Sequence, residues 1–191
     1  MAEPPRRRAC PDQVTSGARP PRWTFALLGS RVRMSAGMAV WLAIGVVVVV
    51  AGPARPLAWA PLLVALTVVA STLVHEAAHA WAAHNLGYRV EWVVLGGFAG
   101  VTAYFGRDDR PLERAAVALA GPAASGGLVV ALLGLRVLLP PSSLVNDLVG
   151  MTIAVNALAL AVNLLPVGGT DGAHLVRGLF QHRRRSGAPR P

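Results

Sequence analysis

The chain contains four long apolar runs, which polar or Pro/Gly-rich segments separate from one another. A helix needs roughly 20 such residues to cross a lipid bilayer. We therefore predict about four transmembrane helices, at residues 36–52, 57–86, 115–139 and 146–165. A cleaved signal peptide is the alternative for the first run, because small residues follow it. The long segment before that run, and the repetition of the pattern downstream, favour a span.

The pattern changes between the second and third runs, just after Gly87, where we expect the second helix to stop. Residues 88–106 hold two β-rich runs, "RVEWVVL" and "GVTAYF", split by "GGFAG". Val, Trp, Tyr, Phe and Thr favour strands, and glycines favour the turn between them. The predicted fold class is an all-α polytopic membrane protein with a small membrane-associated β-hairpin, or a re-entrant segment, at this place. Before the first run, "RVRMS" is either a strand or an interfacial segment.

Both ends of the chain are polar and rich in Arg. Residues 1–22 combine Pro and Arg without an apolar period and are predicted to be a disordered tail, and 183–191 form a second basic tail. Residues 23–182 make one membrane domain. Arg-rich segments favour the cytoplasmic side, and the predicted inner loop, 88–114, carries four Arg residues. An even number of spans then places both termini in the cytoplasm of a multi-pass cell-membrane protein.

Composition narrows the functional classes. Only 14% of residues are charged, and the formal net charge is +9. A positive net charge is also typical of proteins that bind nucleic acid. Here the Arg residues lie in tails and loops without interleaved aromatics, so no nucleic-acid partner is expected. Cys10 is the single cysteine, which excludes an intramolecular disulfide and a cysteine metal site. A metal would have to be bound by His and carboxylate.

The second apolar run contains "HEAAH", residues 75–79. Positions i and i+4 of a helix share one face, so His75 and His79 are able to bind one metal ion together. Glu76 is then placed to act as a general base on a metal-bound water. Zinc suits two imidazoles and a carboxylate. Histidines on a soluble helix are commonly only exposed, but ionisable residues inside a span are functional by default.

A catalytic zinc site needs a third protein ligand and an open position for water. The other acidic residues lie in the tail, in the inner loop or at the far side of the membrane, which leaves Asp171 in "NLLPVGGTDGAHL". Irregular backbone lining a protein cavity is able to bring it to the depth of the histidines. An Asp-Gly turn at the interface is one alternative. His174 is another candidate ligand, although we favour Asp171 and a supporting role for His174.

These motifs, in this order, resemble the site-2 protease family of intramembrane zinc metalloproteases, in a minimal form without PDZ or CBS domain. "STLVHEAAHAWAAHNLGYRV" resembles the family's zinc-binding helix, and "VVLGGFAGVTAYF" its membrane-associated hairpin. "RAAVALAGPAASGGL" resembles its Gly-Pro helix, and "NLLPVGGTDGAHL" its Asn-x-x-Pro followed by Asp-Gly. Two departures stand out. Ser125 takes the place of the family's usual Asn, and "VGGT" lacks a second Pro and a Leu.

The resemblance implies a role for seven residues. The implied zinc ligands are His75, His79 and Asp171, the implied general base and proton shuttle is Glu76, and the implied substrate-binding residues are Asn163, Gly96 and Gly97. Residues 23–182 would then form an intramembrane metalloprotease domain that holds one Zn²⁺ per chain. Asn163 is expected to hold the substrate backbone or the oxyanion, and the two glycines to help clamp the substrate strand.

We therefore predict a zinc-dependent intramembrane endopeptidase, a zinc metalloendopeptidase of the site-2 protease type. It would hydrolyse peptide bonds within or near transmembrane segments of membrane proteins in the bilayer, as in regulated intramembrane proteolysis. Anti-sigma factors and signal-peptide remnants are candidate substrates. One alternative is a proteolytically inactive zinc-binding membrane scaffold. Another is a small transporter or metal permease, which is less favoured because the polar residues cluster near one end of the membrane domain.

Overall fold

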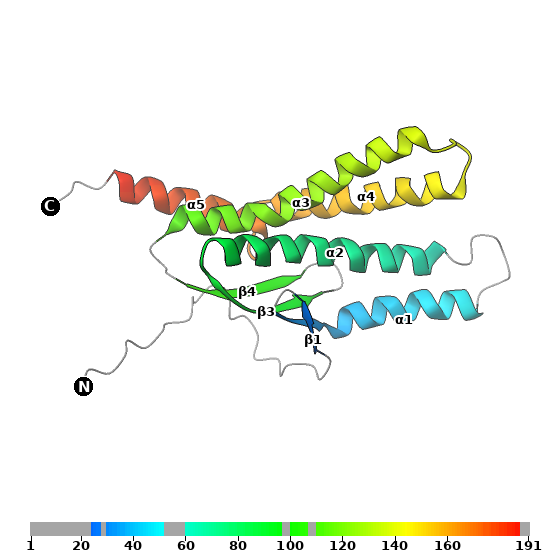
Figure 1. The fold of residues 1–191 in the computed structure, drawn as a ribbon, viewed down its shortest axis with the longest axis horizontal. Helices are drawn as coiled ribbons and strands as arrows, with labels where there is room; N and C mark the ends of the chain where they lie inside the picture. Colours follow the sequence, from blue (N-terminus) through cyan, green and yellow to red (C-terminus); the bar gives the residue numbers. More distant parts are fainter. Residues whose placement is uncertain (1–23, 28–29, 52–59, 97–99, 107–109, 188–191) are drawn as a thin grey trace.

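The computed structural model of the chain describes residues 24–27, 30–51, 60–96, 100–106 and 110–187. Its elements, in chain order, are β1 (Thr24–Leu27), β2 (Ser30–Met34), α1 (Ala36–Ala51), α2 (Ala60–Asn85), β3 (Arg89–Leu95), β4 (Val101–Phe105), α3 (Pro111–Leu138), α4 (Leu144–Leu164) and α5 (Asp171–Ser186). The helices run along the long axis of the molecule, and the strands lie beside α2 (Figure 1). The predicted tail at residues 1–22 lies outside the described residues.

The strands form one four-stranded sheet in the order β1-β2-β3-β4. β1 and β2 are antiparallel, β2 and β3 are parallel, and β3 and β4 are antiparallel. The all-α class with a single hairpin is therefore corrected to a mostly helical fold with a four-stranded sheet. The "RVRMS" segment is strand β2, and its parallel partner comes about sixty residues later, where Arg31 is paired with Trp92. Local sequence patterns do not report such a distant pairing.

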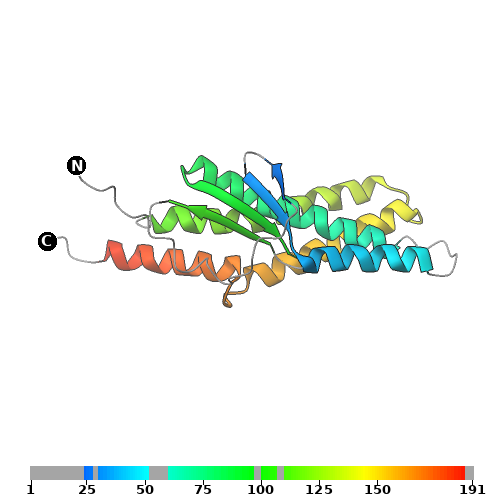
Figure 2. The same cartoon turned by 90° about the horizontal axis from the view of Figure 1, so that it is seen from below.

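One face of the sheet packs against α2 and forms the main apolar core. This cluster consists of buried residues from β2, the start of α1, α2 and β3: Val32, Met38, Ala80, Val93 and Leu95. The strands cross over α2 when the molecule is viewed from the side of the sheet (Figure 2). Other positions of α2 contact α3 and α4. Because α2 lies between the sheet and these helices, His75, Glu76 and His79 on it are buried.

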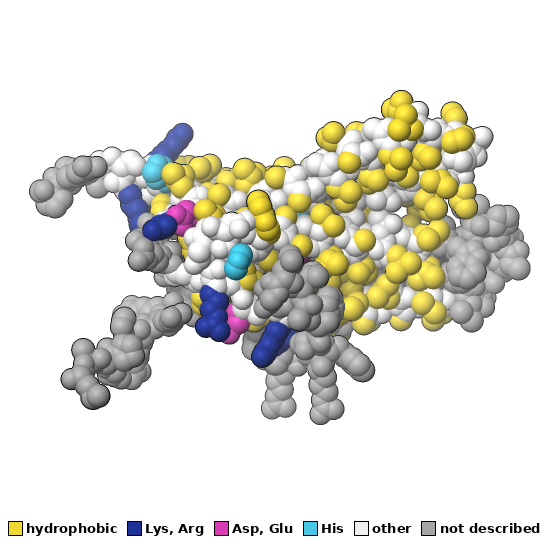
Figure 3. Space-filling model, viewed as in Figure 1, with side chains coloured by type: hydrophobic (Ala, Val, Ile, Leu, Met, Phe, Trp, Pro, Cys, Tyr) yellow, Lys and Arg dark blue, Asp and Glu magenta, His cyan; other side chains and the backbone are white. Residues whose placement is uncertain are grey.

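By length and composition, three described helices are able to cross a membrane. These stretches are Leu62–Asn85, Pro111–Leu138 and Leu144–Leu164. Helix α1 is apolar but has 16 residues, which at 1.5 Å per residue gives about 24 Å against a hydrocarbon core of about 30 Å. A fourth span at 36–52 therefore stays a prediction. In Figure 3, apolar side chains cover the end that contains α1 and the α3–α4 turn, whereas charged side chains gather at the opposite end.

The helix ends have identifiable local causes. Gly87 ends α2 as predicted: its φ of 80° lies in the left-handed region, and the next residue, Tyr88, donates its N–H to the Ala83 carbonyl. Helix α3 begins at Pro111, earlier than predicted, because Pro is well suited to the first turn.

The last helix is longer than predicted. Helix α5 covers Asp171–Ser186 and so includes the first residues of the segment predicted to be a basic tail from residue 183. It packs on the first turns of α3, where Gly178 lies so close to Pro111 and Ala115 that a Cβ would meet the Pro111 carbonyl oxygen at 2.8 Å. This contact holds α5 against α3 and, with it, the first residue of α5 against α2.

Candidate metal centre

The centre starts on α2, which places His75, Glu76 and His79 in the interior. Their exposed fractions are 7%, 3% and 6%. The two histidines are one helical turn apart, so both rings point to the same side, towards α3 and α5. Their Nε2 atoms lie 3.1 Å from each other. Two buried imidazole nitrogens this close are able to share one positively charged partner.

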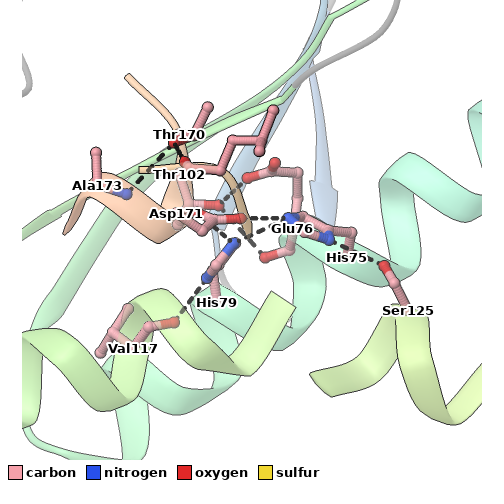
Figure 4. Close-up of polar contacts among 10 residues, drawn as sticks. His75, Glu76, His79, Thr102, Val117, Ser125, Thr170, Asp171 and Ala173 are labelled. Atoms are coloured by element: carbon pink, nitrogen blue, oxygen red, sulfur yellow. Dashed lines mark hydrogen bonds and ion pairs between the residues drawn. The ribbon is translucent and has the colours of Figure 1, made fainter. Parts of the chain in front are cut away.

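Asp171 completes the group from the first turn of α5. Its Oδ2 lies 3.0 Å from Nε2 of His75, and its Oδ1 lies 3.2 Å from Nε2 of His79. Figure 4 shows the three side chains pointing towards one another, with Glu76 beside them. Among the described residues, these three form the group of His and acidic side chains that is able to bind a metal ion.

The non-helical segment between α4 and α5 places Asp171 next to the two histidines. Gly169 has a φ of 87°, which reverses the chain. Thr170 then caps α5 by accepting the Ala173 N–H at 3.3 Å. Gly172 packs on the last turn of α4, where a Cβ would overlap the Leu164 carbonyl. In place of the expected proline, the "VGGT" segment thus contains Gly169 in the left-handed region and the capping residue Thr170.

Residues of α3 contact the Nδ1 atom of each histidine. Nδ1 of His79 donates to the Val117 carbonyl at 2.7 Å. A carbonyl only accepts, so this contact keeps a proton on Nδ1 of His79, and Nε2 is the nitrogen that would offer its lone pair to a bound metal ion. Nδ1 of His75 lies 3.0 Å from the Ser125 hydroxyl. Metal-binding histidines commonly use the second ring nitrogen in this way.

The donor set fits zinc. Zn–N and Zn–O bonds of about 2.0–2.2 Å in a tetrahedral site separate neighbouring ligand atoms by about 3.3 Å. The three separations among His75, His79 and Asp171 are 3.0, 3.1 and 3.2 Å. Two neutral imidazoles and one carboxylate are the ligand types that catalytic zinc sites combine with a fourth, open position. These residues therefore satisfy the number, type and spacing that zinc requires.

Asp171 is ready to bind a cation. Burial opposes its ionisation, but the hydrogen-bonding contacts with His75 and His79 outweigh burial and lower the pKa of Asp171 to about 2. The carboxylate is therefore ionised across the physiological range, with its charge directed between the two imidazoles.

Glu76 is positioned by the sheet, which the sequence did not reveal. The Thr102 hydroxyl on β4 donates to Oε2 of Glu76 at 2.6 Å. Beside it, Gly100 leaves room for the carboxylate, because a Cβ there would overlap Glu76. The sequence "GVTAYF" predicted only a strand. The partner of the Thr102 side chain could not be predicted, because it depends on how the sheet packs on α2. A cleft of about 140 Å³ opens next to Glu76, His79 and Asp171.

Comparisons with known proteins agree with this geometry. No protein-family model matches the chain. Over 126 residues it is 37% identical to "Putative zinc metalloprotease Rip3" of Mycobacterium tuberculosis. Over 121 residues it is 31% identical to "Putative zinc metalloprotease sll0528" of Synechocystis sp.. Each match covers 62% of this chain, and the chain spans 31% of the length of these relatives.

The fold is similar to that of the site-2 protease from Methanocaldococcus jannaschii, with a TM-score of 0.65 at 16% identity. The match covers 84% of this chain and 73% of that one. The chain is thus similar in sequence to these two putative zinc metalloproteases and similar in fold to a site-2 protease. The helix with His75 and His79 and the segment with Asp171 are the motifs that resemble the site-2 protease family.

Gly121 allows the close contact between α2 and α3. A Cβ at Gly121 would overlap Nε2 of His79 and lie 2.6 Å from Nε2 of His75. Gly121 and Pro122 belong to the segment that resembles the family's Gly-Pro helix. In the structure, Gly121 faces the ligand atoms themselves.

The other predicted site residues lie farther from the centre. Asn163 is half-buried near the end of α4, and Gly96 is half-buried after β3. The described residues that line the cleft include neither of them. Gly97 lies outside the described residues. His174 lines the cleft, one turn after Asp171, but does not belong to the three-residue ligand group. Substrate-binding roles for Asn163, Gly96 and Gly97 stay predictions.

Proposed function

We propose that the chain is a zinc-dependent intramembrane endopeptidase that cleaves peptide bonds within or near transmembrane segments of membrane proteins. One observation carries the proposal. His75, His79 and Asp171 meet at 3.0–3.2 Å next to the buried carboxylate of Glu76, which is not needed as a ligand. A site that served only to stabilise the fold would not need a general base beside it.

The chemistry divides between the metal and Glu76. When bound, zinc supplies a Lewis acid that polarises the scissile carbonyl and lowers the pKa of water. Glu76 takes a proton from the attacking water and delivers it to the amine nitrogen of the leaving fragment. The carboxylate thereby returns to its starting state. Thr102 holds one oxygen of Glu76, so the other oxygen is directed to the proton transfer.

The position of the site supports substrates within the membrane. His75 and His79 lie ten and six residues before Asn85, the last residue of α2, which is about 15 and 9 Å along the helix. We infer a multi-pass protein of the cell membrane with both termini in the cytoplasm, where its Arg-rich segments favour placement. Regulated intramembrane proteolysis is the process we propose, with anti-sigma factors or signal-peptide remnants as substrates.

An extended substrate is the form that the site is suited to cut, because a helix hides its peptide bonds. β4 is the last strand of the sheet and carries Thr102, the partner of Glu76. We propose that an unwound substrate segment adds to this sheet, with Gly96 and Gly97 leaving space for its backbone. We further propose that Asn163 binds the substrate backbone or the oxyanion.

The test compares Glu76→Gln with the wild type in detergent, measuring bound zinc and cleavage of single-span substrates together. Glu91→Gln is the matched control, because Glu91 is exposed on β3. We expect all three proteins to bind one zinc, and only Glu76→Gln to lose cleavage, by about 100-fold or more. If all three bind zinc and none cleaves any substrate, a zinc-binding scaffold becomes the better account. If the wild type binds no zinc, the proposed centre is wrong.

A further inference from the structure

Helix α3 presents three positions, four residues apart, to the two histidines. The Val117 carbonyl contacts Nδ1 of His79, Gly121 lies against both Nε2 atoms, and the Ser125 hydroxyl contacts Nδ1 of His75. Positions i, i+4 and i+8 follow one face of a helix. The face of α3 therefore matches the spacing of His75 and His79 on α2, with Val117 and Ser125 as the two polar ends of one row.

The contact between Ser125 and His75 is buried. Ser125 is 4% exposed, and its Oγ lies 3.0 Å from Nδ1 of His75, which is 7% exposed. Water has little access to either group, so each would lack a hydrogen bond without the other. A serine that only allowed the helices to pack closely would not need its hydroxyl at this atom.

The contact also decides which nitrogen of His75 is available. A neutral imidazole carries its proton on one nitrogen and a lone pair on the other. When the Ser125 hydroxyl accepts the Nδ1 proton, the lone pair resides on Nε2, the atom 3.0 Å from Asp171. The Val117 carbonyl has the same effect on His79.

We propose that Ser125 is a positioning residue of the metal centre: its hydroxyl accepts the Nδ1–H of His75 and holds the ring with Nε2 directed at the metal. This inference rests on the proposed zinc site.

The test removes the hydroxyl with Ser125→Ala and measures zinc affinity by competition with a chelator. Partners of metal-bound histidines typically change metal affinity by about 10- to 100-fold, and we expect a loss in this range. Cobalt-loaded protein gives a second readout, because its visible absorption spectrum reports the geometry of the ligands. Ser125→Asn, which restores an acceptor oxygen, should bring zinc affinity back towards that of the wild type.

The matched control is Ser71→Ala. Ser71 is on α2, one turn before His75, and its hydroxyl accepts from Asn156 at 2.8 Å. This change removes a hydroxyl from the same helix bundle without touching the ligands. We expect Ser71→Ala to retain the zinc affinity and the cobalt spectrum of the wild type. Melting temperatures of all variants with the metal removed show whether each one folds.

Each outcome separates the two proposals. If Ser125→Ala binds zinc as tightly as the wild type, the role of Ser125 is refuted while the zinc site stands. Equal losses in Ser71→Ala and Ser125→Ala would also refute it, since the cause would then be general loosening of the bundle. If Ser125→Ala does not fold, Ser125→Asn decides: weakened zinc affinity in a folded Ser125→Asn refutes the acceptor role. If the wild type binds no zinc, both proposals fall.

Discussion

Thr102 on β4 donates a hydrogen bond of 2.6 Å to the carboxylate of Glu76 on α2. The sheet thus fixes the group that we propose as the general base. Thr102→Val keeps the shape of the side chain and removes the donor. We expect cleavage to slow by about 10- to 100-fold, as is typical when such a supporting contact is lost, because the Glu76 carboxylate is then free to rotate. Zinc content should not change.

The control for this prediction is Thr152→Val. Thr152 lies on α4, where its hydroxyl donates to the Leu148 carbonyl at 2.8 Å, away from the centre. Turnover by Thr152→Val should match that of the wild type. A Thr102→Val protein with full activity and full zinc content would show that Glu76 does not depend on the strand.

Gly121→Ala tests the close approach of α3 to the ligands. The added methyl group would occupy the space of Nε2 of His79, so we expect zinc binding to fall below detection in a protein that still inserts and purifies. Gly127→Ala, two turns later on α3, is the control because a Cβ there meets nothing within 4 Å. That change should stabilise the helix by up to about 1 kcal/mol. Metal analysis of the purified proteins measures the difference, and full zinc occupancy in Gly121→Ala would contradict the geometry.

The identity of the third ligand is testable by comparing Asp171→Ala with His174→Ala. Asp171 contacts both imidazoles, whereas His174 lines the cleft without joining the ligand group. We expect Asp171→Ala to weaken zinc binding by more than the 10- to 100-fold typical of supporting residues. His174→Ala should retain zinc affinity within a few-fold. The reverse order of effects would assign the third ligand to His174.

Asn156 links α4 to the metal-binding helix and offers a test of stability. It is 1% exposed, and its amide donates to Ser71 and to the Thr152 carbonyl, both at 2.8 Å. Asn156→Ala should lower the free energy of unfolding by about 1–2 kcal/mol. A double-mutant cycle with Ser71→Ala, measured by denaturant unfolding in detergent, should give a coupling energy of about 0.6–1.7 kcal/mol. A coupling energy near zero would mean that the contact does not hold the two helices together.

The features that the sequence predicted well depend on local geometry. His75 and His79 share a face because of the helical period alone, and Gly87 ends α2 because of its own backbone conformation. Asp171 was reached by excluding other acidic residues, and the structure brings it to the two histidines. The length of α5 was underestimated because its last turns are rich in Arg, which also characterises a basic tail.

The features that the sequence did not predict depend on contacts between distant segments. Helices α1 and α2 separate β2 from β3 along the sequence. Their parallel pairing, and with it the four-stranded sheet, was therefore not predicted. Thr102 and Ser125 are ordinary polar residues in a strand and a helix, and only docking on α2 gives them partners. The predicted first span stays a prediction because the 16 residues of α1 are shorter than a full crossing.

The proposed ligands of the centre are far apart along the chain, because Asp171 follows His75 by 96 positions. During synthesis, α2 with its two histidines is made long before Asp171 joins the chain. A growing polypeptide therefore holds an incomplete ligand set until α3 and α4 have been made and the break after α4 has formed. Assembly of the bundle is thus a precondition of the proposed hydrolysis, and a partly synthesised chain would lack the complete set of ligands.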